Sequence, residues 1–436
     1  MRRDIYFTLQ EWMKRKSRRP VLLRGARQVG KTYVVQELGR NEFDNYVHVN
    51  FEKNPEYKDM FGTFSPKEIL ERISLLTGIE ILPGKTLLFF DEIQECPKAI
   101  TALRYFYEEM PSLHIIAAGS LLEFALRSES LLMPVGRIQY LFMYPMSFME
   151  FLDALGQEKL RKYVTDTSNF PDIPEEIHEK LLELVRKYFI LGGMPAVIQD
   201  YLDSGNIIQC QRIQRSITDT FLDDFAKYAK EVKHQYLTKV FNAVPSMIGD
   251  KFMYARVDKD IKSRELKEAH NLLEMAGIIR KVFNTSGAGL PMKAGMKDNF
   301  FKTIFLDVGL LHSITGVYSE TVSAKDFTSI YNGIIAEQFV GQELIAYQDP
   351  YTRPELYYWA REAKSSNAEV DYLVTVNNRI IPVEVKSGHI GKMKSLQMFM
   401  NKFSSMSGIV ISNSKYNVLK NIRSMPFYAL KSLLYQ

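Results

Sequence analysis

The sequence predicts an α/β fold in which a parallel-sheet domain is followed by a helical region and then by a second α/β domain. Apolar runs of strand length alternate with helical patterns over residues 1–150, as is typical of a helix-covered parallel sheet. Helical patterns dominate residues 151–232. The last hundred or so residues return to apolar strands, some of which carry acidic side chains.

The first expected strand, residues 21–24, runs directly into a glycine-containing loop that precedes a helical pattern. The loop fits the phosphate-binding pattern G-x-x-x-x-G-K-T and reads Gly25-Ala26-Arg27-Gln28-Val29-Gly30-Lys31-Thr32. The two glycines let backbone N–H groups approach phosphate oxygens. Lys31 adds a positive charge near the β- and γ-phosphates, and Thr32 offers a hydroxyl to Mg²⁺. We therefore expect this loop to bind ATP with Mg²⁺.

A second pattern downstream supports the first. The apolar run at residues 86–90 ends in Asp91 and Glu92, and the carboxyl ends of parallel strands are where α/β sheets bind ligands. We expect Asp91 to hold the Mg²⁺ of ATP and Glu92 to orient the attacking water. The paired carboxylates favour hydrolysis of ATP over transfer of its phosphate to a small molecule.

Two further residues are candidates for contacts with the γ-phosphate. Ser120 follows the expected strand at residues 115–118, and it senses the phosphate, caps the next helix, or does both. Arg137 precedes the expected strand at residues 140–143. It either stabilises transition-state charge, in its own subunit or in a neighbouring one, or forms a structural salt bridge. A single chain does not decide between these alternatives.

Residues 151–232 are expected to form a helical lid or linker, and residues 233–320 a winged-helix region. Expected helices at residues 237–248 and 263–276 are followed by paired strands from Gly277. Such a unit either contacts DNA or serves only for packing. The candidate DNA contacts are Lys262, Arg264, Lys267, His270, Arg280 and Lys281.

The final region, residues 321–436, contains a second constellation of charged residues. Asp371 opens one expected strand, and the next carries Glu384 and Lys386 in the pattern E-x-K. Side chains alternate along a strand, so Glu384 and Lys386 lie on one face. Two carboxylates holding Mg²⁺ beside a lysine suit metal-assisted phosphodiester hydrolysis. Glu337, on an upstream helical pattern, is a further candidate ligand.

Composition limits the possible classes of protein. The chain of 436 residues has a net charge of +5, which permits contact with nucleic acid without requiring it. Its two cysteines, Cys96 and Cys210, show no metal-binding spacing. Since no apolar run has the length of a membrane span, we expect a cytoplasmic protein with no membrane partner. The basic run at residues 13–19 is either a solvated loop or a phosphate contact.

Motifs along nearly the whole chain resemble those of prokaryotic AAA-type ATPases with a C-terminal domain of unknown function. Besides the loop and Asp91-Glu92, the resemblance rests on residues 118–120, 136–137, 144–151, 191–195, 302–311 and 383–388. It implies an AAA-like core, a winged-helix region and a restriction-endonuclease-like C-terminal part. An AAA-like core also makes a homo-oligomeric ring an expectation.

Three functions follow from these observations. The leading prediction is a Mg²⁺-dependent ATPase whose nucleotide state controls engagement of double-stranded DNA. The second is a metal-dependent nuclease gated by ATP. The third is an ATP-dependent signalling or scaffold switch that binds a protein partner.

Overall fold

The computed structural model describes the chain except residues 121, 126–133, 135, 167, 169, 229–230, 317–329, 362–367, 388–392, 404, 406 and 434–436. The chain forms two compact units. The N-terminal unit contains residues 2–144 and 349–353, and the C-terminal unit contains residues 145–348 and 354–436 together with Met1. The predicted boundary at residue 150 falls inside a helix of the C-terminal unit, and the one at 320/321 lies outside the described residues.

The N-terminal unit contains a five-stranded sheet in which all neighbouring strands are parallel. Its strands, in the order β2-β3-β4-β1-β5, are β1 (Val21–Arg24), β2 (Asn45–Asn50), β3 (Thr86–Asp91), β4 (His114–Gly119) and β5 (Gln139–Phe142). Its helices are α1 (Ile5–Lys14), α2 (Lys31–Glu42), α3 (Pro66–Thr77), α4 (Pro97–Glu109) and α5 (Leu122–Ala125). The predicted parallel sheet is confirmed, and each predicted strand overlaps an observed one.

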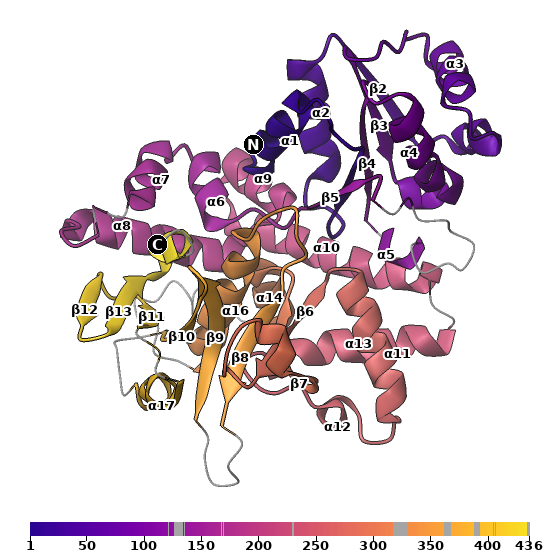
Figure 1. The fold of residues 1–436 in the computed structure, drawn as a ribbon. Coiled ribbons are helices and arrows are strands. Elements are labelled where there is room, and N and C mark those ends of the chain that lie inside the picture. The colour runs from indigo at the N-terminus through magenta and orange to yellow at the C-terminus, as the bar shows by residue number, and fades with distance from the viewer. Residues whose placement is uncertain are drawn as a thin grey trace. The chain divides into compact units, whose positions relative to one another are not determined.

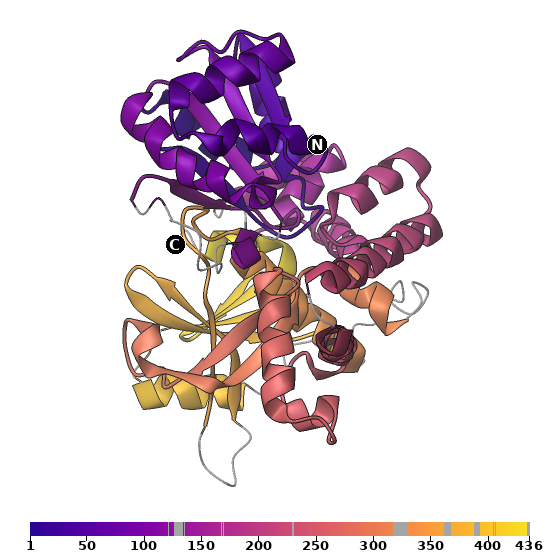
Figure 2. The same cartoon turned by 90° about the vertical axis from the view of Figure 1, so that its right-hand side faces the viewer.

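Helices cover both faces of this sheet, with α1 and α2 on one side and α3 and α4 on the other (Figures 1 and 2). Every residue of β3 is buried. Leu88 and Phe90 pack into the core cluster that includes Ile69 of α3 and Phe106 of α4. Because side chains alternate along a strand, the intervening residues of β3 face the other layer. Burial on both faces explains why β3 is a continuous apolar run.

The C-terminal unit begins with helices, as predicted for this region. They are α6 (Phe148–Ala154), α7 (Glu158–Thr165), α8 (Glu175–Leu191), α9 (Pro195–Ser204), α10 (Ile207–Tyr228), α11 (Glu231–Ala243), α12 (Tyr254–Val257) and α13 (Ser263–Met275). Later helices are α14 (Val308–Thr315), α16 (Ile330–Ala346), α17 (Lys394–Phe403) and α18 (Leu430–Leu433). In the described part of the chain, no helix combines the length and apolar character needed to cross a membrane.

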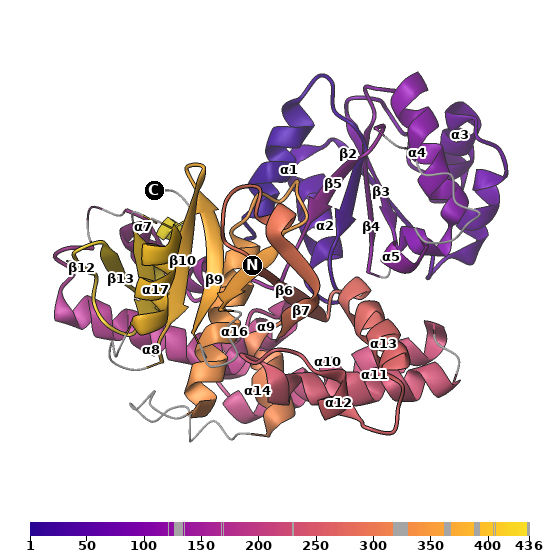
Figure 3. The ribbon, with the colours of Figure 1, turned by 60° about the horizontal axis from the view of Figure 1, so that its bottom comes forward.

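An eight-stranded mixed sheet forms the rest of this unit (Figure 3). The strands, in the order β12-β13-β11-β10-β9-β8-β6-β7, are β6 (Ile279–Thr285), β7 (Met296–Phe305), β8 (Leu356–Ala360), β9 (Glu369–Val376), β10 (Arg379–Val385), β11 (Gly408–Ser412), β12 (Asn417–Leu419) and β13 (Ile422–Pro426). Tyr357 and Trp359 of β8 pack with α17. Tyr358, which alternates with them, lies beside Lys302, so polar side chains collect on the opposite face.

The predicted winged-helix region differs from the observed structure in its hairpin. β6 pairs with β7 on one side and with β8 on the other, so the hairpin belongs to the mixed sheet. His270 is fully buried, and its Nε2 lies 2.9 Å from Thr303 Oγ1. Lys281 forms an ion pair of 2.9 Å with Glu274. These contacts correct the expectation that His270 and Lys281 point toward DNA, because both side chains are used within the fold.

Candidate functional site

The predicted phosphate-binding loop connects β1 to the first turn of α2, which begins at Lys31. Gly30 has φ +96°, a backbone conformation that favours glycine. A Cβ at Gly25 would lie 2.2 Å from the carbonyl oxygen of Met143, so only glycine allows the chain after β5 to approach this closely. The fold therefore requires glycine at both positions, in addition to the need for backbone N–H groups to approach phosphate oxygens.

Lys31 lies over the loop. Its Nζ donates hydrogen bonds to the carbonyl oxygens of Gly25 and Ala26 at 3.0 and 2.8 Å. Burial lowers the pKa of Lys31 to about 8, and the nearby charges of Glu92 and Asp91 oppose this shift. A phosphate group brought to the loop would supply negative charge to the same ammonium and favour its charged form.

Arg3 supports the loop from the N-terminus. One guanidinium nitrogen donates to the carbonyl oxygen of Val29 at 2.6 Å, and another donates to that of Tyr144 at 2.7 Å. Arg3 is almost completely buried. Sequence reasoning did not identify Arg3 because neither carbonyl contact leaves a signal in the sequence.

The strand order brings the other predicted residues to the same edge of the sheet. β4 lies between β1 and β3, and all three are parallel, so the loop, Ser120 and Asp91 follow the carboxyl ends of adjacent strands. The Thr32 hydroxyl lies 3.2 Å from each carboxylate oxygen of Asp91. A hydroxyl and a carboxylate this close form an oxygen donor set that fits Mg²⁺. Ser120 is buried at this edge, and both of its suggested roles stay predictions.

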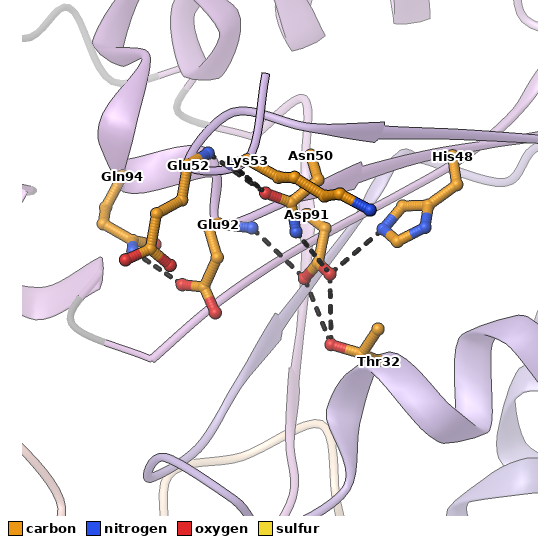
Figure 4. Close-up of polar contacts among 8 residues, drawn as sticks. All are labelled: Thr32, His48, Asn50, Glu52, Lys53, Asp91, Glu92 and Gln94. Atoms are coloured by element: carbon orange, nitrogen blue, oxygen red, sulfur yellow. Dashed lines mark hydrogen bonds and ion pairs between the residues drawn. The ribbon is translucent and has the colours of Figure 1, made fainter. Parts of the chain in front are cut away.

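Two residues of β2 hold the Asp91 carboxylate from the other side (Figure 4). His48 Nε2 lies 3.1 Å from Asp91 Oδ2, and Asn50 Nδ2 donates to the same oxygen at 3.3 Å. The register of the sheet places Asn50 directly beside Asp91. The sequence patterns assigned no role to either residue. The one sequence signal for them is that His48 and Asn50 are two residues apart on a strand next to β3, so their side chains lie on the same face of the sheet.

Glu92 stands in an unusual backbone conformation with φ +50°. A non-glycine residue held in this region is a strained position of the kind that clusters at functional sites. Its carboxylate accepts a hydrogen bond of 2.7 Å from Gln94 Nε2 (Figure 4). Glu92 directly follows Asp91 at this edge of the sheet, and its charge, with that of Asp91, favours the charged form of Lys31.

Arg137 is not brought to the loop. It precedes β5, whose first residue pairs with Val21 at the start of β1, whereas the loop follows the end of β1. A four-residue strand spans roughly 13 Å, so Arg137 lies at the opposite edge of the sheet. There its Nε donates to Glu108 at 2.9 Å. The expected role toward the nucleotide of its own subunit is corrected by this placement, and a role toward a neighbouring subunit stays a prediction.

The acidic residues predicted in the C-terminal unit gather around Lys302, whose side chain is 2% exposed. Its Nζ forms ion pairs with Glu337 at 2.8 Å and with Glu369, and lies 3.9 Å from Asp371. Burial alone would lower the pKa of Lys302, but these carboxylates raise it well above its usual value. Glu337 was expected as a metal ligand, and the structure instead gives it an ammonium partner. Sequence reasoning assigned no role to Lys302 or Glu369.

Asp371, Glu384 and Lys386 form the other half of this cluster. Lys386 Nζ donates to Glu384 Oε1 at 2.6 Å, as the alternation along the strand predicted. Burial, followed by the charge of Glu384, raises the pKa of Asp371 to about 7. Glu384 Oε2 is buried and has no hydrogen-bond partner among the described residues. In the described part of the chain, no group of three or more histidine, cysteine, aspartate or glutamate side chains has a metal-binding arrangement.

Comparison with known proteins gives a family for the N-terminal part. Residues 17–152 match the family model of an AAA domain. This part of the chain therefore has an AAA-type P-loop ATPase fold. Residues 182–321 and 332–430 match two families described as domains of unknown function (DUF8612 and DUF4143). These two families do not support the winged-helix or endonuclease-like predictions. None of the curated proteins matches the sequence.

Several solved structures are similar to this chain. The Walker-type ATPase Paby2304 of Pyrococcus abyssi is 15% identical with a TM-score of 0.46, over 72% of this chain and 95% of that one. The ORC2 protein of Aeropyrum pernix, in ADPNP-ADP complexes, is 9% identical with a TM-score of 0.37, over 77% and 94%. The RuvB Holliday junction branch migration motor of Thermotoga maritima is 17% identical with a TM-score of 0.27, over 64% and 89%.

Proposed function

We propose that this protein binds and hydrolyses ATP with Mg²⁺, and that its nucleotide state controls engagement of DNA by the C-terminal half. The observation that carries the first part is the convergence at one sheet edge of the phosphate-binding loop, the Thr32–Asp91 pair at 3.2 Å and Glu92, which directly follows Asp91. Loop glycines, a hydroxyl beside a carboxylate and a second carboxylate are the parts that in-line attack of water on a phosphoanhydride requires.

Each residue has a defined task in this reaction. The loop N–H groups and Lys31 bind the phosphates, and Lys31 exchanges its carbonyl partners for phosphate oxygens. Thr32 and Asp91 would hold Mg²⁺, which neutralises charge that develops on the phosphates. Glu92 orients the attacking water and accepts its proton. His48 and Asn50 keep the Asp91 carboxylate in place.

Paired variants test this assignment. Lys31→Ala should abolish ATP binding and turnover, because the loop loses the cation that faces the phosphates. Glu92→Gln should bind ATP normally and hydrolyse it at least about a hundredfold more slowly, because the proton acceptor is gone. Lys85→Ala removes an exposed lysine at a surface ion pair and should change neither. Hydrolysis by Glu92→Gln at the wild-type rate would refute the role of Glu92.

The proposed link to DNA is supported by the positive net charge and by Lys262, Arg264 and Lys267, which are exposed at the start of α13. Binding of labelled duplex DNA should be strongest at low salt and should differ between ATP-bound Glu92→Gln and the ADP-bound wild type. Replacing the three basic residues together by alanine should reduce the affinity and the salt dependence. No DNA affinity at low salt would favour the signalling or scaffold switch instead.

A metal-dependent nuclease gated by ATP is the second candidate function. Glu384 Oε2, buried and without a partner among the described residues, favours it, because an uncompensated carboxylate oxygen beside Asp371 suits a cation. Plasmid DNA with Mg²⁺ or Mn²⁺ should be nicked by wild type and not by Lys386→Ala. Lys415→Ala, which removes a lysine paired with Glu175, is the matched control. Absence of cutting by protein that hydrolyses ATP would refute this function.

A further inference from the structure

Gln94 holds the proposed catalytic carboxylate of Glu92 (Figure 4). It lies two residues after Glu92, in a short 3-10 turn that covers Ile93–Glu95. Its side-chain amide donates to Glu92 Oε2 at 2.7 Å. A hydrogen bond to an ionised carboxylate is stronger than one between neutral groups. One oxygen of Glu92 is therefore fixed by a donor from the same turn, while the other is left to accept a proton.

The orientation of the Gln94 amide follows from this bond. The two ends of a glutamine amide differ only in that one donates and the other accepts, and the carboxylate of Glu92 requires the donating end. The accepting end, Oε1, is then directed toward the end of β4. It has no hydrogen-bond partner among the described residues.

The absence of a side chain at Gly119 leaves space for the side-chain amide of Gln94. A Cβ built on Gly119 would lie 2.2 Å from Gln94 Oε1 and 3.3 Å from its amide carbon, and the next contact, with Leu122, is at 3.7 Å. Among the described residues, the only severe clash is thus with the far end of the Gln94 side chain. An alanine at this position would push the amide aside, and it would not require the backbone to move.

We propose that Gln94 is a positioning residue that holds Glu92 toward the phosphate-binding loop, and that Gly119 is the small residue this arrangement needs. The inference rests on the proposed ATPase function. Glu92 directly follows Asp91 at the edge of the sheet where the loop lies, and Gln94 holds its carboxylate by a hydrogen bond of 2.7 Å. Without this hydrogen bond the carboxylate samples other rotamers and is correctly placed for only part of the time.

The test measures kcat and KM for ATP separately. Gln94→Met keeps the size of the side chain and removes the donor, so kcat should fall by roughly ten- to a hundredfold, as expected for the loss of a hydrogen bond to a charged group. KM should stay within about twofold because Gln94 contacts Glu92 and Gly119. Gln10→Met is the matched control, because it removes another glutamine-to-glutamate bond of 2.7 Å, to Glu42 on the surface. It should leave kcat unchanged.

A double-mutant cycle makes the test sharper. Gly119→Ala should lower kcat about as much as Gln94→Ala, because it displaces the amide. The double variant should be no slower than Gln94→Ala, since the atom that the new methyl group would meet is gone. Additive losses would show that Gly119 acts independently of Gln94 and would overturn the proposed arrangement. Retained ATP binding by each variant shows that the site is folded.

The two possible failures are distinguishable. Turnover that disappears in Lys31→Ala establishes the ATPase. If that holds and Gln94→Met has the wild-type kcat, the positioning role is refuted and the ATPase stands. If wild type shows no turnover that depends on Lys31, the proposed function fails, and the role of Gln94 fails with it.

Discussion

Among single residues, Glu343 of α16 is an unusual feature of the C-terminal unit. Its side chain is fully buried, and its two carboxylate oxygens accept the backbone N–H of Phe148 at 3.1 and 3.0 Å. The Tyr188 hydroxyl donates to it at 3.3 Å. Burial raises its pKa from 4.5 to about 8 despite these donors. In the folded protein the proton is therefore held across a pH range in which the unfolded chain releases it.

This raised pKa makes stability depend on pH. Between about pH 4.5 and pH 8 the folded state binds more protons at Glu343 than the unfolded state, so the free energy of unfolding falls as pH rises. Glu343→Gln has no proton to lose, and its amide oxygen can still accept from Phe148. Melting curves from pH 5 to pH 8 should therefore show a loss for wild type, relative to the variant, on the order of a few kcal/mol.

The control for this measurement is Glu183→Gln, at a surface glutamate that pairs with Lys180 at 3.5 Å. It should retain the wild-type dependence on pH. If stability changes equally with pH in wild type and Glu343→Gln, the carboxyl of Glu343 has the same pKa in the folded and unfolded states. That result would contradict the conclusion that burial raises its pKa.

Residues with local signals could be predicted from the sequence, and residues with nonlocal contacts could not. Lys31, Thr32 and Asp91 occupy fixed places in motifs, and the structure brings Thr32 and Asp91 within 3.2 Å. His48 contacts the carboxylate of Asp91 and Gln94 contacts that of Glu92, but the type and spacing of His48 and Gln94 are common in any chain. The role of Lys302 could not be predicted from the sequence either, because a lysine in a strand usually faces solvent.

At the scale of elements, the predictions held where they depended on one segment. The strand at residues 21–24 was predicted with its observed bounds, because its apolar run and the following glycine define it. The hairpin of β6 and β7 was also expected, yet its inclusion in the mixed sheet was not. That inclusion depends on pairing between β6 and β8, which are separated by more than fifty residues and leave no joint pattern in the sequence.

A β-bulge shows the same limit within one element. Tyr357 pairs with Leu373 and Trp359 with Val370, so β9 has one more residue than β8 between these pairs. The extra residue falls at Asp371 and Tyr372, so these two consecutive side chains lie on the same face of the sheet. Tyr372 donates to the carbonyl oxygen of Glu337 at 2.8 Å. Strict alternation predicted the Glu384–Lys386 pair correctly, but it cannot predict a bulge that turns Tyr372 to the same side as Asp371, away from Val370.

At the scale of the whole molecule, each of the two compact units has its own sheet and its own core. The sequence suggested four regions, because changes in pattern divide helical from strand-rich segments. The helical region, the predicted winged-helix region and the described part of the last region instead share one unit. Hydrophobic burial joins segments that differ in secondary structure, and so a change of pattern need not be a domain boundary.

Two units with separate cores should respond differently to nucleotide. ADP with Mg²⁺ at about a hundred times its dissociation constant stabilises the state that binds it by about 2.7 kcal/mol. For a unit of this size, that corresponds to a rise in melting temperature of roughly 5–10 °C. Differential scanning calorimetry should show this rise in the transition of the N-terminal unit alone, and Lys31→Ala should abolish it. A single transition that moves as a whole would show that the two units unfold together, and that binding of nucleotide stabilises both of them.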